Sequence, residues 1–335
     1  MTNTELWSSA AWLASATAWL DERLAAAGRE RTGPVTQPHL RLWGTVLTAP
    51  TADGPVWLKA PGPENAFEVP LYQLLTEVAP DWILRPIAAD ADRGWVLLPD
   101  GGRPLGEQVS EGELPAALAE VLPRYAELQR EVARHVGELL SFGLADMRPA
   151  ALPGAFDEAL DAVGLYLGRH ATDDDRAALR RMAGERATVE AWCERLATSA
   201  VPASLDHHDL HVWNVLMSES GRLQFYDWGD SVIAHPFTTM LVTLGFLRSQ
   251  YGMADDDPRL LGPRDAYLEA FGDLGPRDEL VTELELACRV GKVARTLVWL
   301  RALRPQGFEN AGAFQRAPLE SLLAVVAASH LDLRG

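Results

Sequence analysis

The chain has 335 residues, 47% of them hydrophobic, and is long enough for one large or two ordinary domains with buried cores. Its formal net charge of -17, from 47 acidic and 30 basic residues, argues against a nucleic-acid partner, because phosphate binding depends on Lys and Arg. A cationic partner is compatible with this negative charge.

The cysteines and the N-terminus predict a cytoplasmic protein without a membrane span. Cys193 and Cys288 are the only two cysteines and have neither C-x-x-C nor zinc-ligand spacing, which fits a reducing compartment. The first ten residues lack the basic region of an export signal, and no apolar run approaches the roughly 20 residues that cross a bilayer.

The first hundred residues predict a small antiparallel sheet with two helices. A leading helix is expected from Leu6 to Ala27, before Gly28. A second helix is expected from Phe67 to Val78, where Pro70 is tolerated only near the helix start. The expected strands are His39 to Thr48, Pro55 to Ala60, Trp82 to Ala88 and Gly94 to Leu98.

The run Pro99 to Gly102 breaks this sheet and is the best candidate for a hinge. Beyond it, helical periodicity covers Leu114 to Leu140, Pro153 to Gly168, Asp173 to Ser199, Phe237 to Tyr251, Asp278 to Leu303 and Pro318 to His330. A hairpin from Val215 to Tyr226 interrupts these helices. The prediction is a β-rich lobe with a leading helix over residues 1–98, a hinge over 99–102 and a helical lobe over 103–335.

The polar stretch before this hairpin has the spacing of a phosphoryl-transfer site. Such a site needs a carboxylate that positions and deprotonates a hydroxyl, oxygen ligands for magnesium and a cation on the phosphates. In protein kinases the first two are supplied by Asp-x-x-x-x-Asn and by a second Asp after a β-turn-β excursion. Asp209 and Asn214 have that spacing, and Asp227 follows the hairpin.

Two motifs resemble the aminoglycoside phosphotransferase and choline-kinase-like superfamily. The first is His207-His208-Asp209-Leu210-His211-Val212-Trp213-Asn214, and the second is Tyr226-Asp227-Trp228-Gly229-Asp230. The resemblance implies an α+β, bilobal protein-kinase-like fold, with a small antiparallel-sheet N-lobe and a larger, mainly helical C-lobe. It also implies that Asp209 is the catalytic base, that Asn214 and Asp227 hold magnesium, and that His207, His211 and Asp230 support the site.

A kinase-like fold needs a lysine on the third strand that reaches the phosphates, and Lys59 is the only lysine before Lys292. Its acidic partner is expected on the following helix, with Glu68 preferred and Glu64 second. The full glycine-rich loop of protein kinases is absent, so only Gly44 offers close backbone approach to a phosphate. Adenine is expected at the hinge, around residues 97–101.

Two residues depart from the family motif, because His208 and Trp213 stand where glycine is frequent. Trp213 either shapes the acceptor pocket or packs against the lobe. The two motifs indicate the type of reaction but do not identify the acceptor molecule. Five acids either line a pocket for a cationic acceptor or are solvated surface: Asp255, Asp256, Asp257, Glu283 and Glu285.

The leading prediction is a small-molecule kinase that binds ATP and Mg²⁺ between its lobes and phosphorylates a hydroxyl of an aminoglycoside, an amino sugar or a similar metabolite. One alternative is a non-catalytic, kinase-like nucleotide-binding protein. Another is a metal-dependent hydrolase built on the histidine cluster, although the spacings of His207, His208 and His211 are not common zinc spacings.

Overall fold

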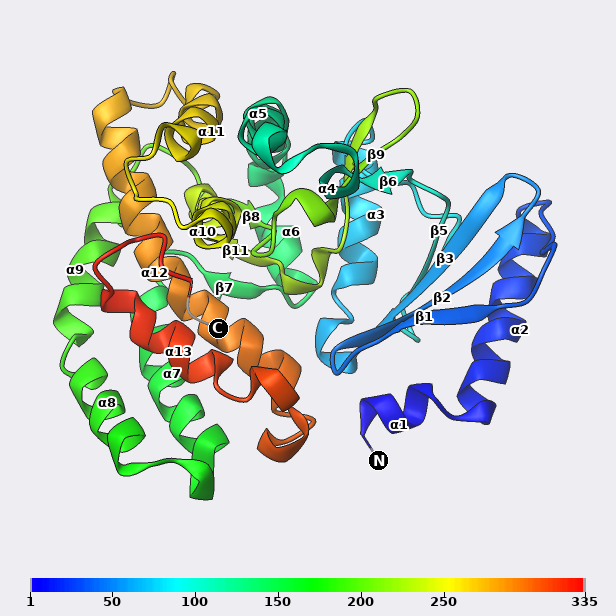
Figure 1. Cartoon of the computed structure of the whole chain (residues 1–335), viewed down its shortest axis with the longest axis horizontal. Helices are drawn as coiled ribbons and strands as arrows, with labels where there is room; N and C mark the ends of the chain where they lie inside the picture. Colours follow the sequence, from blue (N-terminus) through cyan, green and yellow to red (C-terminus); the bar gives the residue numbers. More distant parts are fainter. Residues whose placement is uncertain (1, 334–335) are drawn as a thin grey trace. The chain divides into compact units, whose positions relative to one another are not determined.

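The computed structural model describes residues 2–333, which fall into two compact units (Figure 1). Unit 1 comprises the stretch that ends at Arg103, together with Leu216–Gly229 and Ala302–Ala311. Unit 2 comprises Pro104–Val215, Asp230–Arg301 and the stretch that begins at Gly312. Each unit thus combines separate segments of sequence, and the predicted lobe boundaries at residues 98 and 103 stay a prediction.

Unit 1 is built on a five-stranded antiparallel sheet with the order β1-β2-β3-β5-β4. The strands are β1 (Thr36–Leu40), β2 (Gly44–Thr51), β3 (Gly54–Pro61), β4 (Ala88–Asp90) and β5 (Trp95–Leu98). Two helices, α1 (Asn3–Trp7) and α2 (Ala10–Ala26), precede the sheet, and α3 (Glu68–Val78) follows β3. The predicted small sheet and the helix after its hairpin are confirmed.

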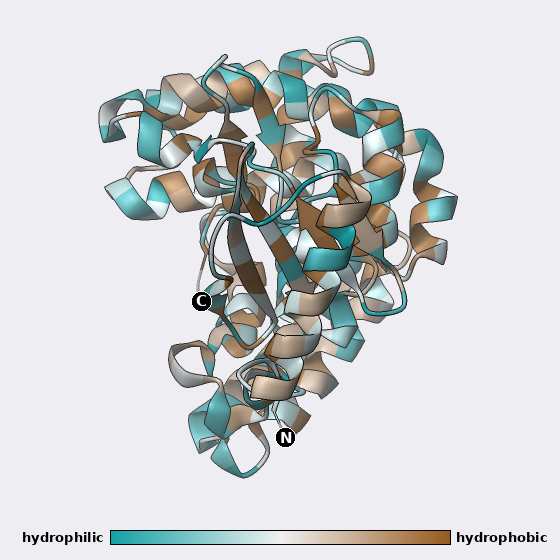
Figure 2. Cartoon of the chain, turned by 90° about the vertical axis from the view of Figure 1, so that its right-hand side faces the viewer, coloured by the Kyte–Doolittle hydropathy of each residue, from teal (hydrophilic) through white to brown (hydrophobic). Residues whose placement is uncertain are grey.

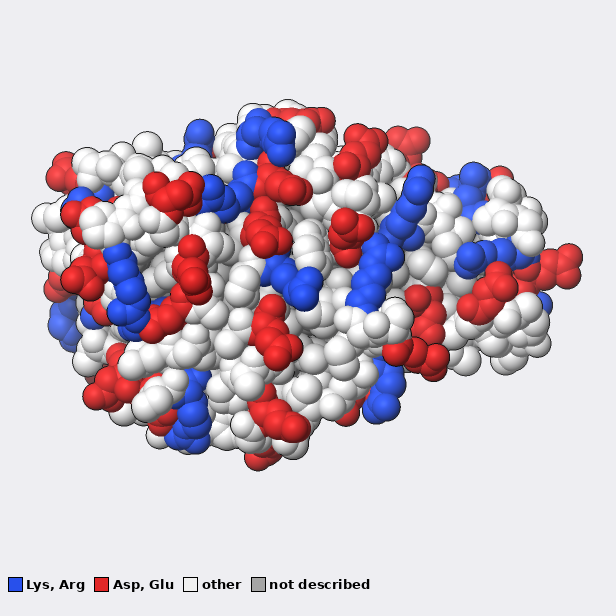
Figure 3. All heavy atoms as spheres, turned by 90° about the horizontal axis from the view of Figure 1, so that it is seen from above, with Lys and Arg blue, Asp and Glu red and all other residues white. Residues whose placement is uncertain are grey.

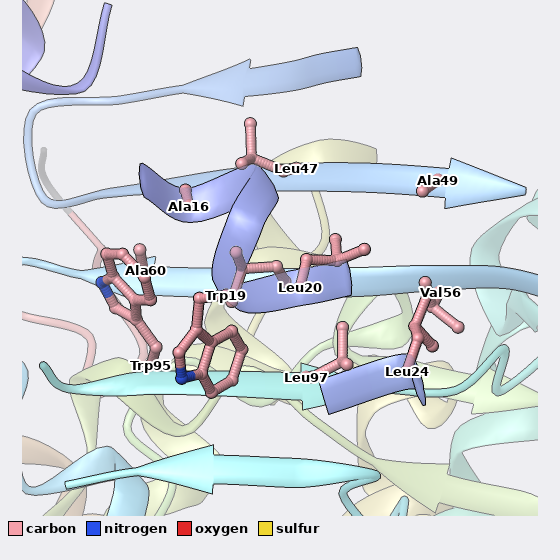
Figure 4. Close-up of a cluster of buried hydrophobic side chains, with 11 residues drawn as sticks. Ala16, Trp19, Leu20, Leu24, Leu47, Ala49, Val56, Ala60, Trp95 and Leu97 are labelled. Atoms are coloured by element: carbon pink, nitrogen blue, oxygen red, sulfur yellow. The ribbon is translucent and has the colours of Figure 1, made fainter. Parts of the chain in front are cut away.

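One face of this sheet packs against α2 (Figure 4). The buried side chains of this core include Ala16, Trp19, Leu20 and Leu24 of α2 and Leu47, Val56, Leu58, Trp95 and Leu97 of the sheet. Burial of each leucine side chain contributes about 1.5–3 kcal/mol to the free energy of folding. Because successive residues of a strand point to opposite faces, Lys59, between the buried Leu58 and Ala60, points away from this core.

Two strand predictions are wrong. The segment from His39 to Thr48 is divided between β1 and β2, because the Arg41 amide donates to the Gly44 carbonyl over 2.9 Å and closes a turn. The segment from Trp82 to Ala88 contributes only its last residue to β4. It contains Pro86, which has no N–H to donate to a sheet ladder.

The hairpin predicted from Val215 to Tyr226 is confirmed. It consists of β9 (Val215–Met217) and β10 (Leu223–Phe225), and β6 (Arg103–Pro104) extends it in the order β10-β9-β6. The Ser218 amide donates to the Arg222 carbonyl over 2.9 Å. Gly221 adopts a φ of 79°, which glycine accepts without a steric penalty.

Unit 2 is mainly helical. The helices that follow the predicted hinge are α4 (Leu105–Gln108), α5 (Leu114–Val132), α6 (Val136–Ser141), α7 (Leu152–Leu167), α8 (Asp173–Ala183), α9 (Arg186–Ala197), α10 (Met240–Tyr251), α11 (Pro258–Glu269), α12 (Arg277–Leu303) and α13 (Ala317–Leu323). A small sheet with the order β7-β11-β8 joins β7 (Ala145–Met147), β11 (Val232–Ala234) and β8 (Ser204–Asp206).

The periodicity located most of these helices but not all of their ends. The predictions for α7 and α12 are confirmed within one residue at each end. Three longer predicted helices are each observed as two helices, which are α1 and α2, α5 and α6, and α8 and α9. The first division has a clear cause, because Ser9 accepts from the Trp12 amide over 3.2 Å and caps a new helix. The helix predicted to His330 ends at Leu323, and α11 was not predicted.

The distribution of hydrophobic and charged residues is typical of amphipathic helices that pack around apolar cores. Hydrophobic and hydrophilic residues alternate around many helices in Figure 2. On the face drawn in Figure 3, acidic and basic side chains are interspersed. None of the helices within residues 2–333 has the length and apolar character that crossing a membrane requires.

Candidate active site

Lys59 is at the centre of a buried cluster of charges in unit 1. Its Nζ forms an ion pair with Glu68 and contacts Asp227 Oδ1 at 2.5 Å. The Glu68 side chain is only 1% exposed. Glu68 is the first residue of α3, and Pro70 is accommodated in the first turn of this helix. Glu68, rather than Glu64, is therefore the carboxylate that pairs with Lys59.

The charge of Lys59 is stabilised by these two neighbours. Burial alone would lower the pKa of Lys59, but the attraction of Asp227 and Glu68 raises it above its ordinary value. Burial also raises the pKa of Tyr72, so its hydroxyl stays protonated. The cluster therefore presents a permanent ammonium group, as a phosphate-binding lysine requires.

The backbone around Asp227 is held in an unusual conformation. Asp227 has a φ of 65°, in the left-handed region that non-glycine residues rarely adopt. Its amide donates to the Tyr72 hydroxyl over 3.3 Å, and the next amide, of Trp228, donates to Glu68 Oε1 over 3.1 Å. These bonds from α3 hold the left-handed turn and aim the Asp227 carboxylate at Lys59.

Two buried oxygens of this cluster have no hydrogen-bond donor within residues 2–333. They are Glu68 Oε2 and Asn65 Oδ1. Both side chains lie close to Gly229. A Cβ atom added at Gly229 would be 3.5 Å from Asn65 Nδ2, 3.6 Å from Glu68 Oε2 and 3.8 Å from Lys59 Nζ. Buried acceptors are normally satisfied, so this corner of unit 1 has spare capacity for donors or a cation. Asn65 carries no motif and was not predicted.

The second set of predicted residues lies together in unit 2, on the loop between β8 and β9. Asn214 Nδ2 donates to the Asp209 carbonyl over 2.8 Å and to Asp209 Oδ2 over 3.2 Å. The amide nitrogen is therefore committed to Asp209. The remaining Oδ1 of Asn214 is an oxygen donor of the kind that Mg²⁺ prefers.

His211 orients Asp209 through a defined tautomer. Its Nδ1 accepts from the Trp213 amide over 3.2 Å, so the proton resides on Nε2, which faces Asp209 Oδ2 at 3.5 Å. The imidazole also stacks on Phe246, with 5.3 Å between ring centroids. These contacts support the predicted role of His211 in positioning the loop, and that role stays a prediction.

Arg295 of α12 is a neighbour of Asp209 that the sequence did not reveal. Its guanidinium NH1 lies 4.0 Å from Asp209 Oδ1. Burial alone would raise the pKa of Asp209, but the hydrogen bond from His211 and the attraction of Arg295 hold it below its ordinary value. Asp209 is therefore ionised at neutral pH, as acceptance of a proton requires.

A buried network below the loop holds His208, which also has a left-handed φ of 63°. The Asp206 carboxylate accepts from the His208 amide over 2.9 Å and lies 2.9 Å from His208 Nδ1. Thr238 donates to the same carboxylate over 2.6 Å. Burial alone would raise the pKa of Asp206, but His208 and Thr238 lower it. Asp206 and Thr238 were not predicted.

The structure also places the remaining residues named from the sequence. Gly44 begins β2 at the turn after β1, His207 is buried with its amide on the Tyr125 hydroxyl at 2.9 Å, and Asp230 is half-buried after Gly229. Their roles stay predictions. Trp213 is 44% exposed and lies against Gly106 of α4, where an added Cβ would be 2.9 Å from the indole ring.

The histidine cluster is not arranged as a metal site. His208 faces Asp206 and His211 faces Asp209, and no three or more His, Cys, Asp or Glu side chains within residues 2–333 are grouped to hold a metal ion. A hydrolase with a metal bound only by such side chains would need a group of that kind. The geometry therefore favours the predicted transferase over this alternative.

A known protein family matches more than half of this chain. The model of the family described as "Phosphotransferase enzyme family" matches residues 63–280, more than half of the chain. No curated protein matches the sequence.

Three solved structures illustrate the fold. A macrolide 2'-phosphotransferase type I is 17% identical over 96% of this chain and 98% of its own, with a TM-score of 0.55. An ethanolamine kinase of Plasmodium vivax is 12% identical over 88% and 82%, with a TM-score of 0.63. An amicoumacin kinase in complex with AMP-PNP, Ca²⁺ and Ami is 12% identical over 97% of this chain and 98% of its own, with a TM-score of 0.59.

At these identities the structural likeness demonstrates the fold but not the substrate. The bilobal, kinase-like α+β fold predicted from the two motifs is confirmed. The match of the family model settles the class of reaction. The chain therefore belongs to the phosphotransferase enzyme family.

Proposed function

We propose that this protein uses MgATP to phosphorylate a hydroxyl group of a small molecule. In this proposal Asp209 accepts the proton of the acceptor hydroxyl, whose oxygen forms a bond to the γ-phosphorus as the bond to the β-phosphate oxygen breaks. ADP and the phosphate ester leave. The observation that carries the proposal is the Asp209 carboxylate, which is ionised and held by Asn214 and His211.

Lys59 is assigned to the nucleotide phosphates. Its ammonium is kept charged by Asp227 and by the buried Glu68. The same carboxylate binds the Trp228 amide beside Asp227. Glu68 therefore positions both the ammonium and the turn that carries Asp227.

Two of the predicted residues carry the kind of oxygen donor that binds magnesium together with a nucleotide. Mg²⁺ is usually held by one or two carboxylates and by substrate phosphates, rather than by a cage made only of protein. Asn214 Oδ1 and the Asp227 carboxylate are donors of this type, and they would hold the ion. When bound, the ion neutralises negative charge that develops on the phosphates.

The proposal is tested by measuring MgATP consumption with alcohol acceptors and by detecting the phosphate ester by mass spectrometry. The acceptor panel contains aminoglycosides, amino sugars, simple sugars, choline, homoserine and nucleosides. Asp209→Ala should reduce transfer by about 10³-fold or more, whereas calorimetry should find MgATP binding largely preserved. An active Asp209→Ala protein would contradict the assignment of the base.

The same experiment distinguishes a non-catalytic nucleotide-binding protein. Such a protein would bind MgATP but phosphorylate none of the panel, and Asp209→Ala would change nothing measurable. If neither MgATP nor MgADP binds, the proposed function itself is wrong.

A further inference from the structure

The two oxygens of the Asp209 carboxylate have different surroundings. Oδ2 accepts from Asn214 Nδ2 over 3.2 Å and faces His211 Nε2 at 3.5 Å. Oδ1 faces the guanidinium of Arg295 at 4.0 Å, which is longer than a hydrogen bond. An acceptor hydroxyl that bonds to Asp209 therefore has more room at Oδ1, on the side of Arg295.

Arg295 has unused hydrogen-bonding capacity at this position. Its side chain is only 14% exposed, and its buried Nε has no acceptor within residues 2–333. A guanidinium carries five N–H donors and is permanently charged. A ligand that offers oxygen atoms at this position would satisfy donors that the described protein leaves unused.

The ring system beside Arg295 fixes the orientation of the guanidinium. Arg295 lies over Trp299, one turn further along α12, with 5.6 Å from its Cζ to the ring centroid. Trp299 stacks on Phe314 with 5.2 Å between centroids, and Phe314 is 39% exposed. Packing against Trp299 thus restricts the guanidinium, and a guanidinium can bind a planar oxyanion through two parallel hydrogen bonds.

Three of the five acids that the sequence offered for a cationic acceptor have partners of their own. Asp255 contacts Arg248 at 2.6 Å, Asp257 contacts Arg259 at 2.6 Å, and the buried Glu283 accepts from Ser199 over 2.7 Å. None of these contacts involves Asp209. The cation that does lie beside Asp209 is Arg295.

We propose that the acceptor carries a carboxylate or phosphate group close to the hydroxyl that is phosphorylated, and that Arg295 binds this oxyanion. The proposal deepens the proposed function and rests on the assignment of Asp209 as its base. An anionic substituent would meet the guanidinium, whereas an ammonium group in the same place would be repelled by it. Arg295 is then the residue that determines specificity for the acceptor.

The test uses probes of matched size with different charge. D-glucuronate and glucose 6-phosphate are compared with neutral glucose and cationic glucosamine, and D-glycerate is compared with glycerol. Binding is measured by calorimetry with and without MgADP, and phosphorylation is measured with MgATP. The variants are Arg295→Gln and Arg295→Lys, and Arg277→Gln at the exposed start of the same helix is the matched control.

We expect the wild-type protein to bind at least one anionic probe about 10- to 100-fold more tightly than its neutral partner. Arg295→Gln should remove this preference, and Arg295→Lys should retain part of it, because an ammonium preserves the charge but not the planar fork. Arg277→Gln should behave as wild type. The binding of MgADP should be the same in all four proteins.

Three results would overturn the inference while leaving the proposed function intact. The first is a wild-type preference for glucosamine or for the neutral probes. The second is an anionic preference that survives in Arg295→Gln. The third is a failure of all three anionic probes to bind although MgADP binds.

Discussion

The Lys59 cluster of unit 1 and the Asp209 loop of unit 2 use the same backbone device in different ways. Asp227 and His208 are the two non-glycine residues with positive φ among residues 2–333. Such residues cost about 1–3 kcal/mol and tend to occur at functional sites. In unit 1 the strained residue itself carries the carboxylate that is proposed to bind the metal, whereas in unit 2 it immediately precedes Asp209.

The two regions also differ in how charge is compensated. In unit 1 a cation lies between two carboxylates, and one of them, Glu68, is almost completely buried. In unit 2 a carboxylate lies among donors, and the Asp209 side chain is 32% exposed. Because Glu68 is the most buried of these carboxylates, we expect loss of the Lys59 charge to destabilise the protein, whereas a change of charge at Asp209 should have little effect on folding.

The largest effect on stability is expected from Lys59→Met. Burial raises the pKa of Glu68, and removal of the ammonium leaves this carboxyl buried without a cation, so that it either stays charged at a cost or takes up a proton. Loss of one partner of a buried ion pair typically costs about 3–5 kcal/mol. Urea unfolding should therefore show a loss of this size in the free energy of unfolding.

The double variant Lys59→Met with Glu68→Gln is the matched control for this loss. It removes both charges and should recover most of the lost stability, because a neutral amide costs less to bury than an unpaired carboxylate. A single Lys59→Met protein as stable as wild type would mean that the cluster is not coupled to folding.

A smaller effect is expected from a comparison of His208→Gly with His208→Ala. Both variants remove the imidazole from Asp206, so the loss of that contact cancels between them. The left-handed conformation costs a non-glycine residue about 1–2 kcal/mol, and the glycine variant should be the more stable by about that amount. Equal free energies of unfolding would contradict a strained His208.

The smallest change in stability is expected from Asp209→Asn. The carboxylate is partly exposed and its contacts with Arg295 and His211 are long, so its loss should change the free energy of unfolding by about 1 kcal/mol or less. The same substitution should nevertheless abolish most phosphoryl transfer. A large loss of stability would place Asp209 with the Lys59 cluster and remove the contrast between the two regions.

The sequence predicted the parts of the site that depend on spacing along the chain. Asp209 and Asn214 are five residues apart on one loop and contact each other. Strand alternation predicts that the Lys59 side chain lies on the face of the sheet opposite to the buried neighbours Leu58 and Ala60. Pro70 is tolerated only near a helix start, which indicates that α3 begins close to Glu68. Spacing could not choose between Glu68 and Glu64, because the choice depends on where α3 begins.

Other parts of the site depend on residues that are distant in sequence. Arg295 reaches Asp209 from α12, and Thr238 reaches Asp206 from the segment before α10. The strands β7, β8 and β11 have three residues each, too few for a periodic pattern to be recognised. The segment from Trp82 to Ala88 is apolar enough to suggest a strand, but only Ala88 belongs to β4, and Ile83 forms an isolated bridge to Phe225.

By itself the sequence predicted the reaction class and the fold class, through motifs that resemble a known family, and it named the groups that the proposed chemistry needs, because motifs depend on local spacing and residue type. Only the tertiary structure decided which carboxylate pairs with Lys59, which residues hold the two left-handed turns and which cation lies beside Asp209. The physical reason is that burial and Coulomb interactions depend on distances in space, and packing brings together side chains whose separation along the chain carries no signal.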